Sequence, residues 1–394
     1  MSHLKMKDLD LNNKTILIRV DLNVPIKDGK VLNDDRVKAV LPTIRLAAQS
    51  AKKILLMSHL GRPIEGKPID EQMEASLLPI AKHLSSLLGC DVPVIDNYLN
   101  APELIEQNPA QTLLLENVRI NEGEKSNLDS LARKYAELCD LFVMDAFGTA
   151  HRAQASTHGV ARYAPVACAG PLLAAELQAL EKSLSNPTRP LMAIVGGSKV
   201  STKLQVLESL ATIVDKLILG GGIANTFLAA CGVNVGRSLY EKDFLESARK
   251  IMGLTFVPLP SDVVTAKSFS KEAMAEEKVL SDIEDDDIVM DVGPETRSHF
   301  SDLIREMNTV IWNGPLGVFE FPQFAKGTES IALAVAKSGG FSIAGGGETV
   351  TAIDHFSVRD KISYISTGGG AFLEYVQGIK LPAVQILEEK VISI

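Results

Sequence analysis

The chain has 394 residues, of which 46% are hydrophobic and 23% charged, a composition typical of folded domains rather than of a disordered polymer. At this length we expect two domains. The net charge of −9 argues against a broad nucleic-acid-binding surface, but it leaves room for local clusters of positive charge that bind small anions.

The hydropathy pattern and the cysteines indicate in which cellular compartment the protein is expected. The N-terminal segment MSHLKMKDLD lacks the apolar stretch of a secretory signal. The longest apolar stretch, 217–233, is interrupted by glycines and polar residues, so we expect no transmembrane segment. The four cysteines are widely separated and form no CxxC pair, which argues against a zinc site or a disulfide framework: Cys90, Cys139, Cys168 and Cys231. We therefore expect a cytoplasmic protein with no membrane partner.

The first half contains four short Ile/Leu/Val runs, at 15–20, 53–57, 112–115 and 141–144. Runs without alternation predict strands buried on both faces, as in a parallel sheet covered by helices. Polar residues of anion-binding type follow each run: Asp21 and Asn23 with Arg36 nearby, then His59 and Arg62, then Arg119, then Arg152.

These polar residues predict one anion pocket. Ligands of parallel sheets bind at the carboxyl ends of the strands, and guanidinium groups match the geometry of phosphates and carboxylates. Any one of these arginines would more often form a surface ion pair. Their repetition at successive strand ends favours the pocket.

A break in the pattern separates the two halves. Residues 172–184 predict one amphipathic helix, preceded by Gly170-Pro171 and ended by Asn186-Pro187. We predict a first domain at 1–170, a connecting helix with hinges at 171–186, and a second domain at 187–378.

The second half repeats the alternation of strands and helices. It has strand patterns at 191–195, 216–219, 288–291, 309–312, 340–343 and 362–365, with helical patterns such as 201–213 and 329–337 between them. The fold class is therefore α/β. We expect two Rossmann-like domains, each a mainly parallel sheet with helices on both faces.

Four glycine clusters follow strands of the second half, at 196–197, 220–222, 345–347 and 368–370. Glycine lets backbone N–H groups approach a phosphate closely, and a helix start adds a positive dipole end. One such cluster would be a tight turn, but four at four strand ends favour a phosphate crevice. Lys199 and Lys203 follow the first cluster, and their spacing places them on one face of the predicted helix, where phosphate contact is favoured over a solvated surface.

Two further segments are ambiguous or misleading. Residues 312–320 hold the only tryptophan, Trp312, and two Gly/Pro turns; a nucleoside pocket with Asn313 and Glu320 as polar handles and a structural loop explain this equally well. The acidic run 284–287 favours a solvated turn before a strand over a metal site.

The residues alone favour a phosphotransferase acting between a nucleotide and a small anion. A nicotinamide dehydrogenase is the enzymatic alternative, but the GxGxxG motif followed by a ribose-binding acid is missing. A non-catalytic nucleotide-binding scaffold is the other alternative, and it would have no use for the arginines.

Nine motifs in order resemble the phosphoglycerate kinase family over nearly the whole chain. In the first half these are RVDLNVP (19–25), SHLGRP (58–63), LENVR (115–119) and DAFGTAHR (145–152). In the second half they are GGSKVSTK (196–203), GGGIANTF (220–227), WNGPLGVFE (312–320), GGGET (345–349) and STGGGA (366–371).

The resemblance implies reversible phosphoryl transfer between ATP and 3-phosphoglycerate, giving ADP and 1,3-bisphosphoglycerate, by a monomer that uses Mg²⁺. It implies that the first domain binds phosphoglycerate, that the second binds the nucleotide, and that residues 379–394 return to the first domain. The phosphoglycerate contacts it implies are Asp21, Asn23, Arg36, His59, Arg62, Arg119 and Arg152. The nucleotide contacts it implies are Gly197, Lys203, Gly221, Asn313, Glu320, Gly346, Gly347, Glu348 and Thr349.

The resemblance also implies that Arg36 and Lys199 are catalytic and stabilise the phosphoryl group in transfer. One position departs from the family pattern: the family has GGGDT, with an aspartate where this chain has Glu348. That carboxylate normally binds magnesium. We assign the metal to Glu348, since the longer side chain keeps the charge and the oxygen ligands.

Overall fold

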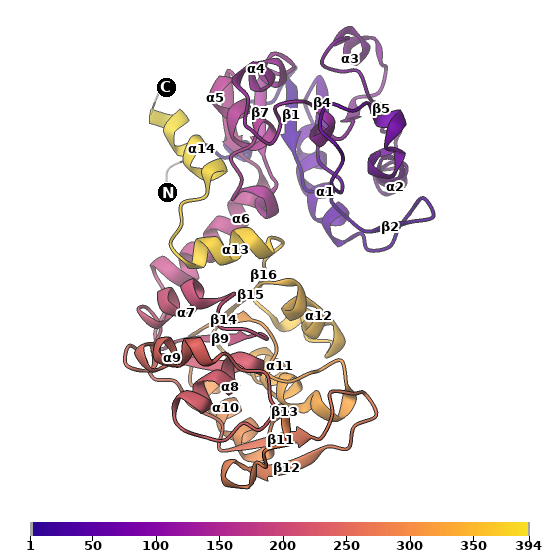
Figure 1. The fold of residues 1–394 in the computed structure, drawn as a ribbon. Helices are drawn as coiled ribbons and strands as arrows, with labels where there is room; N and C mark the ends of the chain where they lie inside the picture. The colour runs from indigo at the N-terminus through magenta and orange to yellow at the C-terminus, as the bar shows by residue number, and fades with distance from the viewer. Residues whose placement is uncertain (1–2, 393–394) are drawn as a thin grey trace. The chain divides into compact units, whose positions relative to one another are not determined.

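A computed structural model describes residues 3–392, and the contacts divide the chain into two compact units (Figure 1). The N-terminal unit comprises the residues up to Leu177 and those from Lys380 onward, and the C-terminal unit is Gln178–Ile379. The first division falls inside helix α6 (Pro171–Leu180), which continues as π-helical turns to Ser185. Within the described residues, no helix has both the length and the apolar character needed to cross a bilayer.

The N-terminal unit is built on a six-stranded parallel sheet in the order β5-β6-β4-β1-β7-β8. Every residue of the four predicted strands β1, β4, β6 and β7 is buried, which explains why their sequences are apolar without alternation. The bounds are β1 Thr15–Arg19, β4 Lys53–Met57, β5 Val94–Ile95, β6 Thr112–Leu115, β7 Leu141–Met144 and β8 Val166–Ala169. The sequence patterns missed β5, which has only two residues, and β8, which is rich in alanine.

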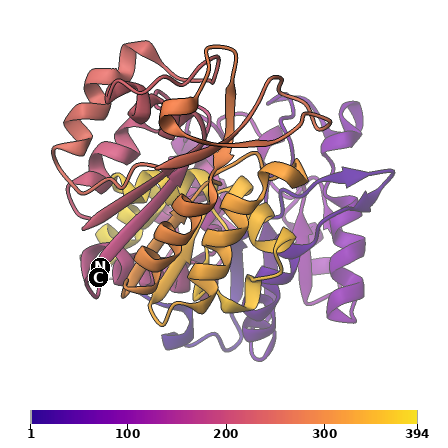
Figure 2. The same ribbon diagram turned by 90° about the horizontal axis from the view of Figure 1, so that it is seen from below.

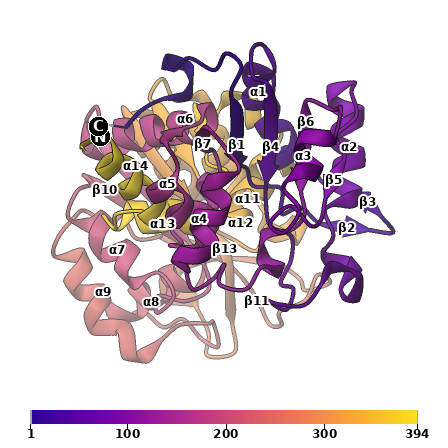
Figure 3. The same cartoon turned by 90° about the horizontal axis from the view of Figure 1, so that it is seen from above.

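Helices flank this sheet, and a short hairpin of β2 (Ile26–Lys27) and β3 (Lys30–Val31) lies outside it. The helices are α1 Asp35–Ala48, α2 Leu78–Leu88, α3 Glu103–Gln107, α4 Asp129–Glu137 and α5 Val160–Tyr163. The last helix, α14 (Pro382–Ile392), packs against α5 and β8 (Figures 1 and 3). The C-terminal segment is therefore part of the N-terminal unit.

The C-terminal unit is built on a five-stranded parallel sheet in the order β10-β9-β14-β15-β16, covered by helices (Figure 2). Its strands are β9 Leu191–Gly196, β10 Lys216–Gly220, β14 Thr309–Asn313, β15 Phe341–Ala344 and β16 Tyr364–Ile365. Its helices are α7 Leu204–Ala211, α8 Gly221–Ala230, α9 Leu245–Met252, α10 Pro294–Arg305, α11 Lys326–Lys337, α12 Gly347–His355 and α13 Gly369–Val376. The two units thus have the predicted mixed α/β fold.

One predicted strand lies in a different sheet. The run at 288–291 forms β13 (Ile288–Val292), which pairs antiparallel with β11 (Asp262–Ala266) in a three-stranded sheet completed by β12 (Glu276–Val279). The apolar pattern did not reveal this sheet, because β12 has a largely exposed Glu-Glu-Lys-Val sequence. Met290 of β13 and Val264 of β11 pack on Phe324 in a small separate core.

Candidate active site

The anion pocket predicted for the N-terminal unit forms where β6, β4, β1 and β7 end. These strands are neighbours in a parallel sheet, so the residues that follow them lie along one edge. His59 follows β4 and is 3% exposed. Its pKa lies well below the usual value, because burial disfavours the charged ring and because Arg19, Arg119, Arg152 and Arg36 surround it. The structure therefore brings four arginines to one histidine.

Asp21, Asn23 and Arg36 form a connected group beside this cluster. The Arg36 guanidinium lies 3.2 Å from an Asp21 carboxylate oxygen and donates to the Asn23 carbonyl at 3.0 Å. The Asn23 side-chain oxygen accepts from the backbone N–H of Gly61 at 3.0 Å. These contacts tie the loop after β1 to the start of α1 and to the loop after β4, which fixes Arg36 in place.

Arg119 is the most buried of the predicted arginines, at 9% exposure. It donates to the Gly61 carbonyl at 2.5 Å, while its Nε has no hydrogen-bond partner among the described residues. Burial, together with the nearby Arg152 and Arg19, lowers its pKa to about 10. A buried guanidinium that lies near other cations and keeps a donor unused has the chemistry that suits an anion.

The other two predicted arginines are less constrained. Arg152 is half-buried, and its Nε contacts His151 Nε2 at 3.2 Å. Arg62 is exposed and makes no hydrogen bond or ion pair within residues 3–392. The structure thus supports the position of Arg152 near His59, and it leaves Arg62 free to reach a ligand.

The sequence patterns missed one residue of this site, Arg19. It ends the apolar strand β1, is 1% exposed, and contacts His59 Nδ1 at 3.1 Å. Burial lowers its pKa from the usual value. An arginine that completes a wholly buried strand is itself an unusual signal, since cations are almost never buried without a partner.

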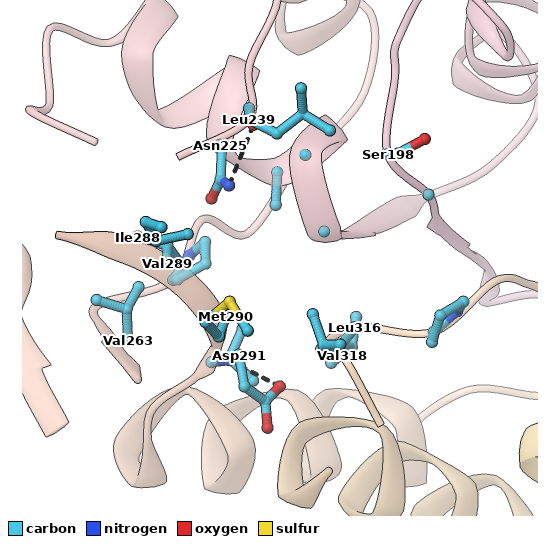
Figure 4. Close-up of a pocket in the computed structure, with 18 of the residues that line it drawn as sticks. Ser198, Asn225, Leu239, Val263, Ile288, Val289, Met290, Asp291, Leu316 and Val318 are labelled. Atoms are coloured by element: carbon cyan, nitrogen blue, oxygen red, sulfur yellow. Dashed lines mark hydrogen bonds between the residues drawn. The ribbon is translucent and has the colours of Figure 1, made fainter. Parts of the chain in front are cut away.

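In the C-terminal unit, a cavity of about 310 Å³ lies between α8, β13 and the loop after β14 (Figure 4). Its wall is mostly apolar and includes Leu239, Val289, Met290, Leu316 and Val318. Four residues predicted to contact nucleotide also line it: Gly197, Gly221, Glu320 and Glu348. An apolar pocket with a few polar groups at its rim suits a flat aromatic base.

The sequence predicted Glu320 as a nucleotide contact, but it identified none of the apolar residues that form the wall of this cavity. Val289 and Met290 come from the antiparallel sheet that the patterns missed, and Leu239 comes from an irregular loop. The segment 312–320 has two parts. Residues 315–318 and Glu320 line the cavity, while Trp312 lies in the core and donates to the Gly314 carbonyl at 2.9 Å. The nucleoside pocket therefore stays a prediction for the first part, and Trp312 has a structural role.

A second cavity of about 250 Å³ gathers six of the predicted nucleotide residues: Lys203, Asn313, Gly346, Gly347, Glu348 and Thr349. Lys203 Nζ donates to the Gly196 carbonyl at 2.5 Å and to Asn313 Oδ1 at 2.7 Å. Burial lowers the Lys203 pKa to about 8, and the nearby Glu348 carboxylate partly opposes this shift. The ammonium group is therefore positioned before any ligand arrives.

Asn313 and Thr349 hold the loops around that lysine. Asn313 Nδ2 donates to the Gly345 carbonyl at 2.7 Å, and Thr349 Oγ1 accepts from the Gly314 N–H at 2.7 Å. Both side chains are almost fully buried. Their polar groups are largely used within the protein, so they position Lys203 and the glycine backbone.

The expectation that Lys199 and Lys203 share a helix face is wrong. Helix α7 begins only at Leu204, and the preceding residues form turns. The Glu241 carboxylate holds these turns by accepting from the Ser201 N–H at 2.8 Å and the Ser201 hydroxyl at 2.6 Å. Lys199 is exposed and lines neither cavity. Its backbone carbonyl accepts from the Thr202 hydroxyl at 2.9 Å, while its side chain makes no hydrogen bond or ion pair in the described chain.

The glycine clusters serve two different purposes. A Cβ atom at Gly196 would lie 1.7 Å from the Pro315 carbonyl oxygen, and one at Gly222 would lie 2.1 Å from the Ser198 carbonyl oxygen. These glycines are required by close packing between loops. By contrast, Gly347 at the start of α12 faces open space, so its backbone is accessible to a ligand.

The acidic run 284–287 is neutralised by lysines. Lys267 Nζ lies 2.6 Å from carboxylate oxygens of both Glu284 and Asp286, and Lys278 Nζ lies 2.9 Å from Asp287. Glu284 and Asp286 are exposed, whereas Asp287 is fully buried. The run is therefore a turn stabilised by ion pairs, which fits the expected turn except that Asp287 is not solvated.

Comparison with known proteins identifies the family. The family model described as phosphoglycerate kinase matches residues 6–379. The chain belongs to the phosphoglycerate kinase family. A phosphoglycerate kinase structure from Coxiella burnetii is 49% identical, with a TM-score of 0.92, over 99% of this chain and 100% of that one. A phosphoglycerate kinase structure from Pyrococcus horikoshii OT3 is 31% identical, with a TM-score of 0.83, over the same shares.

The family assignment confirms the predicted activity. The chain is an enzyme that catalyses ATP-dependent phosphoryl transfer involving 3-phosphoglycerate, a step of glycolysis. The two alternatives considered from the sequence, a nicotinamide dehydrogenase and a non-catalytic nucleotide-binding scaffold, are therefore wrong. The family generally uses ATP with Mg²⁺.

Proposed function

We propose that the N-terminal unit binds 3-phosphoglycerate and that the C-terminal unit binds the nucleotide. The observation that carries this proposal is the contrast between the two sites. The first is a cluster of buried and half-buried arginines around His59, suited to a compact polyanion. The second combines an apolar cavity with a fixed lysine and an accessible helix start, suited to a base and its phosphates.

Specific roles follow for the predicted residues. Asp21, Asn23, Arg36, His59, Arg62, Arg119 and Arg152 bind phosphoglycerate, whereas Gly197, Gly221 and Glu320 border the base and Lys203, Asn313 and residues 346–349 border the phosphates. Support comes from the shared position of the first group after strands of one sheet and of the second around two cavities.

The chemistry requires alignment and charge neutralisation rather than a base. The acceptor is a carboxylate, or an ADP phosphate oxygen in the reverse direction, and both are ionised at neutral pH. Transfer passes through a loose transition state whose charge cations stabilise. We propose that Arg36 and Lys199 supply these cations; Lys199 is an exposed lysine without an internal partner, and Arg36 is held by Asp21.

Glu348 fits a role in holding magnesium. Its carboxylate is exposed, borders both cavities, and makes no hydrogen bond or ion pair in the described part of the chain. Carboxylate oxygens and water are the ligands that Mg²⁺ prefers. When bound, the ion would neutralise charge on the nucleotide phosphates. Glu348 is placed to hold it, directly or through water, beside the N–H groups at the start of α12.

We further propose a cytoplasmic monomer with no nucleic-acid or membrane partner. The net charge of −9 and the four free cysteines support this. Light scattering of the purified chain gives its mass in solution.

A double dissociation tests the two-site proposal. Arg119→Ala is expected to weaken 3-phosphoglycerate binding by about tenfold or more, the loss of a charged hydrogen bond, and to leave ADP binding unchanged. Lys203→Met is expected to weaken ADP binding and to leave 3-phosphoglycerate binding unchanged. Calorimetric titration of the full chain with each ligand measures both, alongside ATP formation from ADP and 1,3-bisphosphoglycerate. Equal losses for both ligands in either variant would contradict the division.

A further inference from the structure

A chain of hydrogen bonds runs from His59 into the interior of the N-terminal unit. Arg19 Nη2 lies 3.1 Å from His59 Nδ1, and Arg19 Nε lies 3.0 Å from the Ser156 hydroxyl. Ser156 in turn lies 2.6 Å from one carboxylate oxygen of Glu124 through its hydroxyl and 3.1 Å from the other through its backbone N–H. Arg19, Ser156 and Glu124 are all fully buried or nearly so.

The chemistry of these groups fixes the direction of every bond. A guanidinium can only donate, so His59 Nδ1 and the Ser156 hydroxyl oxygen must both accept from Arg19. Ser156 has one hydroxyl proton, and it therefore goes to Glu124. This series of hydrogen bonds begins at Glu124, whose pKa burial raises to about 7 and whose ionised form balances the buried charge of Arg19. It ends at an imidazole nitrogen that carries no proton. The direction of the bonds that Arg19 makes is the same whether Glu124 is ionised or neutral, because Arg19 is a donor in both cases.

An accepting Nδ1 excludes the imidazolium form of His59, because both ring nitrogens of an imidazolium are donors. It leaves a neutral ring with the proton on Nε2, a nitrogen with no hydrogen-bond partner among residues 3–392. The surrounding arginines act in the same direction, since they disfavour a further positive charge. The site thus binds an anion with a neutral histidine donor between permanent cations.

We infer that Glu124, Ser156 and Arg19 are positioning residues that hold His59 as a neutral imidazole with its proton on Nε2, ready to donate to the substrate anion. The inference rests on the proposed role of His59 in binding phosphoglycerate. Neither Glu124 nor Ser156 belongs to the predicted contacts, and each acts only through Arg19.

Nitrogen NMR of the full chain with ¹⁵N-labelled histidine tests the inference directly. The chain has seven histidines, and the His59→Gln variant assigns the His59 signals. We expect an unprotonated Nδ1 and a protonated Nε2 from pH 6 to 8 without substrate. An imidazolium, or a proton on Nδ1, overturns the inference whatever the variants do.

Two variants test whether Ser156 and Glu124 position His59 through Arg19. Ser156→Ala removes the acceptor of Arg19 Nε, and Glu124→Gln removes the balancing charge. Both are expected to give His59 a mixture of protonation states and to raise the KM for 3-phosphoglycerate about tenfold, with the KM for ADP unchanged. A raised KM with an unchanged His59 spectrum would overturn the positioning role of Glu124 and Ser156, because a purely structural effect of the substitutions predicts that result.

Ser85→Ala is the matched control. Ser85 lies in α2 of the same unit, and its hydroxyl donates to the Ala81 carbonyl at 2.9 Å and accepts from the Val92 N–H at 3.0 Å, so neither contact belongs to the bonds that lead to His59. This variant is expected to lose stability while keeping the His59 spectrum and both KM values. If Arg119→Ala leaves phosphoglycerate affinity intact, the proposed function fails while the tautomer result still stands on its own.

Discussion

The two sites of this enzyme use opposite means to bind charged ligands. In the N-terminal unit, side chains provide the charge: Arg19, Arg119 and Arg152 gather around His59 with few carboxylates to balance them. In the C-terminal unit, the backbone and an apolar wall provide most of the surface, and the half-buried Lys203 adds a positive charge. Substitutions should therefore act through charge in the first site and through shape and backbone position in the second.

Asp291 is an exception to this rule, and it predicts the largest effect. It borders the apolar cavity, is 2% exposed, and accepts from the backbone N–H groups of Gly327 at 2.7 Å and Val292 at 2.9 Å (Figure 4). Burial raises its pKa to about 7. The folded state therefore binds this proton more tightly than the unfolded state, and its stabilising contribution is lost as pH rises from about 4 to about 7.

The stability of wild type relative to Asp291→Asn should fall across that pH range by about 2–4 kcal/mol in total. Denaturant titrations followed by fluorescence of Trp312, which is buried in the same unit, measure this. Asp243→Asn, at an exposed site, is the control and should show no such trend. A difference that grows with pH would mean that Asp291 is ionised throughout.

Lys199 tests whether an unanchored cation can be catalytic. If it stabilises the phosphoryl group in transfer, Lys199→Ala should lower kcat by about a hundredfold, or about 3 kcal/mol, with little change in either KM. Lys242→Ala, at an exposed lysine in the same unit, should leave kcat unchanged. Steady-state kinetics in both directions provide the measurement. Normal turnover of Lys199→Ala removes it from the mechanism.

Sequence reasoning predicted the sheets better than the loops, for a physical reason. Strands such as β1 and β9 are buried along their whole length, so their apolar runs are unambiguous. The start of α7 was placed too early because the contact that prevents it, Glu241 with Ser201, joins residues 40 positions apart. The exposed strand β12 gave no apolar pattern at all.

The same limit applies to the sites. Lys203 and Asn313 were found because they lie in recognisable motifs, and the structure joins them at 2.7 Å. Arg19 lies in such a motif too, but its role depends on Ser156, which is 137 residues away. Spacing in the sequence cannot reveal a hydrogen bond of that kind.

Arg62 tests the N-terminal site at its exposed edge. Arg62→Ala should raise the KM for 3-phosphoglycerate about tenfold, because one charge-assisted contact with the anion is lost, and should leave the KM for ADP unchanged. The matched control is Arg45→Ala, at an exposed arginine of α1 outside the cluster. If the two variants behave alike, Arg62 is a surface residue and the anion site is confined to the buried arginines.

Glu348 predicts the smallest effect and tests the C-terminal site where charge and backbone meet. Its carboxylate stands one residue after Gly347, at a helix start that attracts phosphate. A bare carboxylate there would repel the same phosphate, and a cation between them removes the conflict. Glu348→Gln should therefore raise the magnesium concentration for half-maximal activity severalfold, about 1 kcal/mol, and leave 3-phosphoglycerate binding intact.

Two further variants serve as controls for Glu348→Gln. Glu348→Asp should have a milder effect because it keeps the charge, and Glu329→Gln, at an exposed first-turn position of α11, should have no effect. If the Gln variant needs no more magnesium than wild type, the nucleotide alone holds the metal and Glu348 only begins a helix, so the phosphates would be bound by Lys203 and the backbone without this carboxylate.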